Sequence, residues 1–214
     1  MSTRAPMQAG EAAPDFSLPA VHRDGNVSLG DYRGKSPVLV AIFRGLYCPF
    51  CRRGIAQLSG VSDKLRAAGV ETLAVVATEA DNARLYFKYR PSKMSIVADP
   101  ACSTHRAFGL PSPPITDELV QAFMASKINP TGELPEPMNV MEAVHKLDES
   151  DGHTNTETDD RDNEKQPTQL KGQFLLDRDG IVRWANIECA QEGIPGFGKF
   201  PTEADLMAAV RSLA

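Results

Sequence analysis

The sequence lacks the features that mark several large classes of protein. No apolar run approaches the roughly 20 residues that a helix needs to cross a bilayer, and the opening MSTRAPMQAGEAAPDF has no apolar stretch like that of a secretory signal. The net charge is −5 and the basic residues form no stripe, which argues against nucleic acid as a partner. We therefore expect a protein that binds neither membrane nor nucleic acid, with the cytoplasm as its compartment.

Cysteine is scarce, and its placement excludes further classes. Four cysteines scattered over 214 residues do not resemble the framework of a disulfide-stapled domain. Cys48 and Cys51 are separated by two residues, but a zinc site needs a second pair of ligands. Cys102 and Cys189 stand alone, and no two histidines form an HxxxH pair. We therefore expect no metal and no organic cofactor.

The Cys48–Cys51 pair lies between a predicted buried strand and a predicted helix. The segment VLVAIF, residues 38–43, is apolar throughout, as expected of a strand covered on both faces. After a short turn, apolar residues recur at helical spacing between residues 55 and 65, and Gly69 ends the pattern. Pro49 fits the first helical turn, because its missing N–H costs nothing there. The pair is thus predicted at a helix N-terminus.

This position has a chemical consequence for the two thiols. Free N–H groups at a helix start favour negative charge and so stabilise a thiolate, and Arg44, Arg52 and Arg53 are expected to add positive charge nearby. The thiolate is the nucleophile in both disulfide exchange and peroxide reduction. Redox chemistry at Cys48 and Cys51 is our first interpretation, and an inert buried pair is the alternative.

The rest of the chain predicts a single α/β domain over residues 1–214. A second buried strand after the helix makes a parallel βαβ unit, and hairpin signals at both ends add further strands. We expect a central mixed β-sheet flanked by helices. The expected strands lie at 70–77, at 95–98, in an N-terminal hairpin over 16–29 and in a last hairpin over 172–186, and further helices at about 78–90, 99–108 and 201–213.

An insertion at about 111–169 interrupts this pattern before the last hairpin. Six prolines fall between residues 111 and 137, and residues 139–147 are a candidate short helix. Residues 148–166 carry eight acidic residues, two basic residues and no apolar ones. Such a run buries too little surface to offset the entropy of ordering. We therefore expect an acidic, mobile loop there, as a solvated linker rather than a docking tail.

In their order, four segments resemble the thioredoxin-fold redoxins, and most closely the peroxiredoxin-like branch of the AhpC/TSA family. They are GEAAPDFSLPAVHRDGNVSLGDYRGK, VLVAIFRGLYCPFCRR, SIVADPACSTHRAFGL and GQFLLDRDGIVRWANI. The resemblance covers about 10–110 and 170–213 and leaves out the insertion. It implies a thioredoxin-like fold, reduction of hydroperoxides by cysteine without a cofactor, and a thioredoxin- or glutaredoxin-type reductant. Such relatives are frequently homodimers, so a homodimer is also implied.

This chain departs from the peroxide site of that family. The family motif Pro-x-x-x-Thr-x-x-Cys, laid on this chain, puts the attacking thiolate at Cys51, with Cys48 in place of Thr and Arg44 in place of Pro. The family's Arg before the returning strand matches Lys171, which keeps the charge but loses the planar fork, and Arg44 is expected to replace part of that cation. Thioredoxins and glutaredoxins instead imply attack by Cys48 and resolution by Cys51, and their cis-proline also falls at Lys171. The resemblance leaves the nucleophile open.

Four other kinds of residue are weaker candidates. Tyr47 either shields the pair or is simply packing. Cys189 and Cys102 are candidates for a resolving thiol, although a free cysteine is often just a small buried apolar residue. Trp184 is expected in the core, and the four histidines at the surface or in structural positions.

The function predicted from these residues is that of a thiol peroxidase. Cys48 and Cys51 would cycle between dithiol and disulfide while hydroperoxides are reduced. A thiol–disulfide oxidoreductase without useful peroxidase activity is one alternative. Another is a redox-sensing binding module, in which the disulfide state reshapes residues 111–169.

Overall fold

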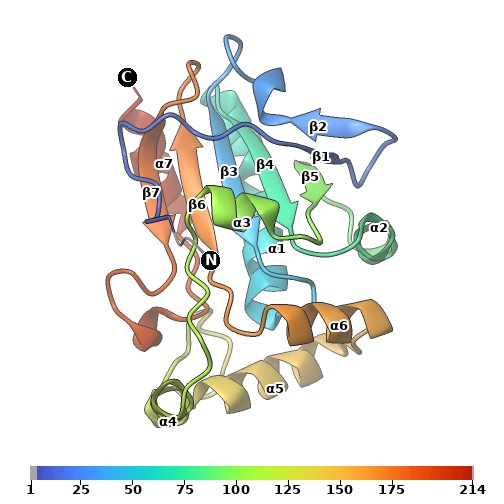
Figure 1. The fold of residues 1–214 in the computed structure, drawn as a ribbon, viewed down its shortest axis with the longest axis vertical. Helices are drawn as coiled ribbons and strands as arrows, with labels where there is room; N and C mark the ends of the chain where they lie inside the picture. Colours follow the sequence, from blue (N-terminus) through green and yellow to red (C-terminus); the bar gives the residue numbers. More distant parts are fainter. Residues whose placement is uncertain (1–3, 214) are drawn as a thin grey trace.

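A computed structural model describes residues 4–213 and confirms the α/β, thioredoxin-like architecture (Figure 1). Five strands form one mixed sheet in the order β5-β4-β3-β6-β7. The first three of these are parallel to one another, and the last two form an antiparallel hairpin whose first strand pairs with β3. The strands are β3 (Val38–Phe43), β4 (Glu71–Val76), β5 (Ser95–Ala98), β6 (Gly172–Leu176) and β7 (Val182–Ile187).

Alternate residues of β3 point into two separate apolar clusters, as the period of a strand requires. Leu39, Ala41 and Phe43 belong to the cluster that contains the buried side chains of α1 (Pro49–Ala67). Val38, Val40 and Ile42 belong to the cluster on the other face of the sheet. The uninterrupted apolar run predicted from the sequence is thus a strand buried on both faces. Further helices are α2 (Ala80–Tyr89), α3 (Ser103–Ala107) and α7 (Glu203–Arg211), with 3-10 turns at Leu29–Asp31 and Ile194–Gly196.

The predicted N-terminal hairpin is present as a separate two-stranded sheet. Its strands, β1 (Ser17–Pro19) and β2 (Asn26–Ser28), pair antiparallel. Ala20, just after β1, makes an isolated bridge to Val97 of β5, which fastens the hairpin to the edge of the main sheet. Among the helices of residues 4–213, none combines the length and the apolarity needed to cross a bilayer.

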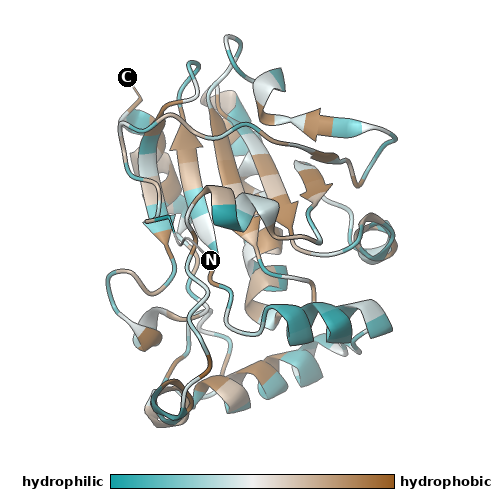
Figure 2. Cartoon of the chain, viewed as in Figure 1, coloured by the Kyte–Doolittle hydropathy of each residue, from teal (hydrophilic) through white to brown (hydrophobic). Residues whose placement is uncertain are grey.

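The expected acidic loop at 148–166 is wrong, because most of this segment is helical. The insertion contains three helices, α4 (Asp117–Ala125), α5 (Val140–Asp151) and α6 (Glu157–Lys165). They lie together at the end of the sheet where β3 leads into α1 (Figure 1). Figure 2 shows α6 as mostly hydrophilic, as its composition requires.

Local hydrogen bonding explains why such a polar segment is ordered. Thr156 and Asp159 form a capping box at the start of α6, as Asn139 and Glu142 do at the start of α5. The side chain of Asp159 also accepts a hydrogen bond from Asn82 of α2, at 2.9 Å. Composition alone therefore understated the order of this segment, since its polar groups find partners within the protein.

Asp162 of α6 should destabilise the protein at neutral pH. Only 1% of this residue is exposed, and its Oδ2 makes no hydrogen bond with any residue between 4 and 213. Burial raises the pKa of its carboxyl, so folding opposes its ionisation. We expect Asp162→Asn to raise the free energy of unfolding at pH 7 by about 1 kcal/mol. Urea denaturation measures this change.

The pH dependence distinguishes this cause from a general effect of charge. As the pH falls through the raised pKa, the native wild type binds a proton before the unfolded chain does, so the advantage of the variant shrinks. Glu164→Gln, on the exposed side of the same helix, is the matched control and should change stability little at pH 7 or pH 4. A loss of stability in Asp162→Asn at pH 7 would show that the carboxylate is favourably paired.

Candidate active site

The predicted position of the cysteine pair is confirmed. Cys48 is the N-cap of α1 and Pro49 occupies its first turn. The backbone N–H of Cys51 donates to the carbonyl of Cys48 at 3.1 Å, so the two residues are one helical turn apart. Both thiols are free, and the exposed fraction is 5% for Cys48 and 0% for Cys51. The pair is therefore enclosed, with Cys48 the nearer of the two to solvent.

Two buried cations, Arg44 and Lys171, converge on one carboxylate beside the pair. Each is 1% exposed. Arg44 Nη2 lies 3.0 Å from Oε1 of Glu188, and Lys171 Nζ lies 3.6 Å from the same oxygen. Lys171 also donates to the carbonyl of Gly198 at 2.8 Å. Both cations named from the sequence thus belong to one buried cluster.

Glu188 is the site residue that sequence reasoning missed. It directly follows β7, just as Lys171 directly precedes β6, so the antiparallel hairpin brings the two residues opposite each other. The N–H of Glu188 donates to the Lys171 carbonyl at 3.1 Å, and its carboxylate accepts from the N–H of Gly198 at 2.8 Å. The register of the predicted hairpin was the signal that could have identified it.

An aromatic ring covers this cluster and links it to the insertion. The Arg44 guanidinium lies 4.4 Å from the ring centroid of Phe197, which is a cation–π contact. Phe197 in turn packs against Phe50, between the two cysteines, and against Phe123 of α4, with centroids 5.7 Å and 5.2 Å apart. The cations are therefore screened from water by apolar surface, which strengthens their effect on neighbouring charges.

The two thiols have opposite pKa shifts. Burial opposes ionisation of Cys48, but a hydrogen bond from Cys51 and the charges of Arg44 and Lys171 outweigh it, so the pKa of Cys48 is lowered. For Cys51, burial and then its hydrogen bond and proximity to Cys48 raise the pKa well above its ordinary value. The arrangement favours a thiolate at Cys48 beside a neutral thiol at Cys51.

Arg52 and Arg53 do not supply charge to the thiols, contrary to the prediction from the sequence. Both guanidinium groups turn toward acidic side chains of the insertion. Arg52 pairs with Asp148 and Asp151 of α5, and Arg53 pairs with Asp151 and with Glu133 at 2.8 Å. Their charge is therefore largely compensated at the start of α1.

Tyr47 connects the loop before Cys48 to the insertion. Its hydroxyl donates to the backbone carbonyl of Gln166 at 3.1 Å, and burial raises the pKa of the phenol. A Cβ at Gly45 would lie 2.7 Å from the Tyr47 ring, so glycine leaves the room that this ring needs. Tyr47 is thus a tether as well as a packed side chain.

The other two cysteines are poorly suited to ionise. Burial first, and then Asp99 for Cys102 and Glu188 for Cys189, raise the pKa of each thiol to about 12. Both have left-handed backbone, with φ of 51° and 64°. The Cys102 thiol donates to the side chain of Gln166. A resolving role for Cys189 or Cys102 stays a prediction.

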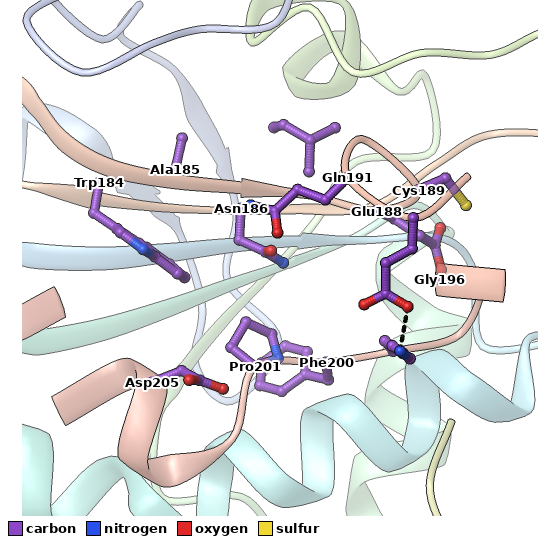
Figure 3. Close-up of a pocket in the computed structure, with 13 residues that line it drawn as sticks. Trp184, Ala185, Asn186, Glu188, Cys189, Gln191, Gly196, Phe200, Pro201 and Asp205 are labelled. Atoms are coloured by element: carbon purple, nitrogen blue, oxygen red, sulfur yellow. Dashed lines mark hydrogen bonds and ion pairs between the residues drawn. The ribbon is translucent and has the colours of Figure 1, made fainter. Parts of the chain in front are cut away.

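A cavity of about 320 Å³ lies beside β7, with Trp184 at one end and Cys189 at the other (Figure 3). Trp184 is half-buried and packs against the apolar core, while also lining this cavity. Of the four histidines, only His105 is fully buried, and burial lowers its pKa to about 4. In the part of the chain that the structure describes, His, Cys, Asp and Glu side chains form no group of three or more that could hold a metal ion.

Solved structures with this fold include two kinds of thiol protein. Reduced 2-Cys peroxiredoxin from Plasmodium vivax matches with a TM-score of 0.60 and 14% identity, over 96% of this chain and 95% of that chain. Peroxidoxin BcpB from Mycobacterium tuberculosis matches with 0.59 and 12%, over 97% and 96%. A protein assigned as the thiol:disulfide interchange protein DsbE of Chlorobium tepidum matches with 0.56 and 20%, over 95% and 99%. These identities show a shared fold.

Sequence comparison identifies the family. No curated protein matches the chain. The profile of the AhpC/TSA family, however, matches residues 9–185, which is most of the 214 residues and includes both cysteines of the pair. The chain therefore belongs to the AhpC/TSA family, which indicates a thiol-dependent oxidoreductase.

Proposed function

We propose that this protein is a thiol peroxidase in which Cys48 attacks a hydroperoxide and Cys51 resolves the product. The observation that carries the proposal is the opposite state of the two thiols, with Cys48 favoured as a thiolate between Arg44 and Lys171. Only 5% of Cys48 is exposed, so a small hydroperoxide can approach it more easily than a folded protein disulfide. This assignment follows the thioredoxin-type order of roles, although the reaction is that of a peroxidase.

The proposed reaction has two steps. The Cys48 thiolate attacks the terminal oxygen of the hydroperoxide, the O–O bond breaks, and the alkoxide that leaves takes up a proton to become an alcohol, or water from hydrogen peroxide. Sulfur is oxidised to sulfenic acid and the peroxide is reduced. The Cys51 thiol then condenses with the sulfenic acid, which releases water and forms the disulfide.

Arg44 is suited to stabilise the leaving oxygen. Its Nε is buried and makes no hydrogen bond with any residue that the structure describes, so a donor remains for a substrate oxygen. A fixed cation beside a developing negative charge lowers the barrier, because no reorganisation is needed at the moment of reaction. Lys171 adds a second charge but is already engaged with the Gly198 carbonyl.

The cycle needs an external reductant. A thioredoxin- or glutaredoxin-type dithiol would reduce the Cys48–Cys51 disulfide by exchange through a mixed disulfide. Such reductants maintain thiols in the cytoplasm, which is our proposed compartment. A homodimer is also proposed, from the habit of related proteins.

Thiol–disulfide exchange is the second candidate function. A first cysteine with a lowered pKa and a second with a raised pKa also suits attack on a disulfide by Cys48. This alternative requires that a bulky disulfide reach a sulfur that is almost wholly enclosed. Displacement of the insertion would then have to precede the reaction.

Stopped-flow mixing of the reduced protein with hydrogen peroxide separates these possibilities. Trp184 is the only tryptophan, so its fluorescence reports on one place in the fold. We expect rapid oxidation of the wild type, a stable sulfenic acid on Cys48 in Cys51→Ser, and no rapid phase in Cys48→Ser. Mass spectrometry identifies the oxidised residue. Should neither thiol react faster than free cysteine while insulin disulfides are reduced, the exchange function is the correct one.

Loss of Arg44 should raise the pKa of Cys48, because its charge favours the thiolate. In Arg44→Gln, the titration of the Cys48 thiolate at 240 nm should move toward the value of free cysteine, about 8.5. Each unit of that shift leaves about tenfold less thiolate below the midpoint, with a matching loss of rate at pH 6. Lys199→Gln, which removes an exposed cation paired with Glu192, is the control and should leave the midpoint in place. Equal midpoints in the wild type and Arg44→Gln would contradict this role.

A further inference from the structure

We propose that Arg52, held in place by Asp148 and Asp151, is a positioning residue for Cys48, and that the end of α5 is therefore a working part of the active site. The proposal rests on the proposed function, since it takes Cys48 as the nucleophile. It assigns a role to a segment whose composition predicts only a solvated loop.

The first step concerns the bond that Arg52 makes to the loop before Cys48. Nη1 of Arg52 donates to the backbone carbonyl of Leu46 at 2.9 Å, and its backbone N–H donates to the carbonyl of Cys48 at 3.1 Å. One residue of α1 therefore connects both sides of the N-cap. Leu46 is 1% exposed, so water cannot easily replace this donor. A buried carbonyl without its partner costs about 1–3 kcal/mol, and the loop would move to avoid that cost.

The second step concerns what keeps Arg52 there. The residue is 4% exposed, and a buried guanidinium without an acid partner is strongly unfavourable. Its Nη2 donates to Asp148 and, at 2.9 Å, to Asp151. Removal of these carboxylates would therefore favour withdrawal of Arg52 toward solvent, and the Leu46 carbonyl would lose its donor.

The placement of the acids on α5 supports this arrangement. Asp148 and Asp151 lie in the last turn of the helix, where the helix dipole disfavours negative charge, and no basic residue lies in that turn. As an isolated helix, α5 would be destabilised by these residues. The cations of α1 compensate for this, so α5 and the start of α1 depend on each other.

A second tether from the insertion holds the next residue of the loop. The Tyr47 hydroxyl donates to the Gln166 carbonyl at 3.1 Å, and Gln166 Nε2 donates to the carbonyl of Ala77, just after β4, at 3.0 Å. Leu46 is thus held through α5 and Tyr47 through the end of α6. The insertion therefore fixes the two residues that precede Cys48 from two directions.

Arg53 supplies a matched comparison for Arg52. It is adjacent in sequence, carries the same charge and shares Asp151, but its remaining partners are Glu133 and Ser150. None of its hydrogen bonds goes to the loop that precedes Cys48. A general effect of positive charge or of binding α5 should be similar in Arg52→Gln and Arg53→Gln, whereas an effect through Leu46 should occur only in Arg52→Gln.

The test is the pH titration of the Cys48 thiolate in these variants. The charged and titratable groups that face Cys48 are Arg44, Lys171, Glu188 and Cys51, and all of them are retained. We expect the midpoint in Arg52→Gln to rise by about one pH unit, with about tenfold slower oxidation by hydrogen peroxide below that midpoint. Asp148→Asn should shift the midpoint in the same direction, and the controls Arg53→Gln and Glu133→Gln should not shift it.

Each outcome has a defined meaning. Equal midpoints in Arg52→Gln and Arg53→Gln would overturn the proposal and leave Arg52 an ordinary ion-pairing residue. Circular dichroism checks the fold, and if Arg52→Gln does not fold, the comparison of Asp148→Asn with Glu133→Gln decides. Failure of the proposed function is seen separately, as a wild type whose Cys48 does not react with peroxide, because the titration midpoints can be compared without any substrate.

Discussion

The buried ion pair between Arg44 and Glu188 is the interaction on which the site depends. It joins the end of β3 to the end of β7, positions that are 144 residues apart in the chain. Neither side chain can remain buried without the other, because an isolated charge in an apolar interior is strongly unfavourable. The pair therefore fixes where the last hairpin sits relative to the cysteines, and it brings Lys171 to the same carboxylate. The fold and the electrostatics of the thiols share this one contact.

Local patterns were sufficient to predict the parts of the structure that depend on nearby residues. The run from Val38 to Phe43, the proline at position 49 and the apolar spacing of α1 placed Cys48 at a helix N-terminus, and the structure has it there. Glu188 was missed because a single glutamate after a strand carries no pattern of its own. Its position becomes informative only when the hairpin register places it opposite Lys171.

The acidic segment shows where reasoning from composition fails. Its capping boxes, such as Thr156 with Asp159, were present in the sequence and predict helix starts. Net charge alone outweighed them in the prediction. Neither signal reveals that Arg52 and Arg53, about 100 residues earlier in the chain, meet Asp151. Long-range pairing of this kind decides whether a charged segment is solvated or packed, and sequence position does not disclose it.

The charges of the buried cluster set a condition on the catalytic cycle. With Cys48 as a thiolate, two cations, Arg44 and Lys171, are balanced by two anions, Glu188 and the sulfur. A disulfide between Cys48 and Cys51 is neutral, so oxidation leaves one positive charge without a counterion in a region almost closed to water. Electroneutrality then favours the reduced state, entry of an anion, or partial opening of the covering segments. The same cluster that activates the sulfur thus makes its disulfide a strong oxidant, ready to accept electrons from a reductant.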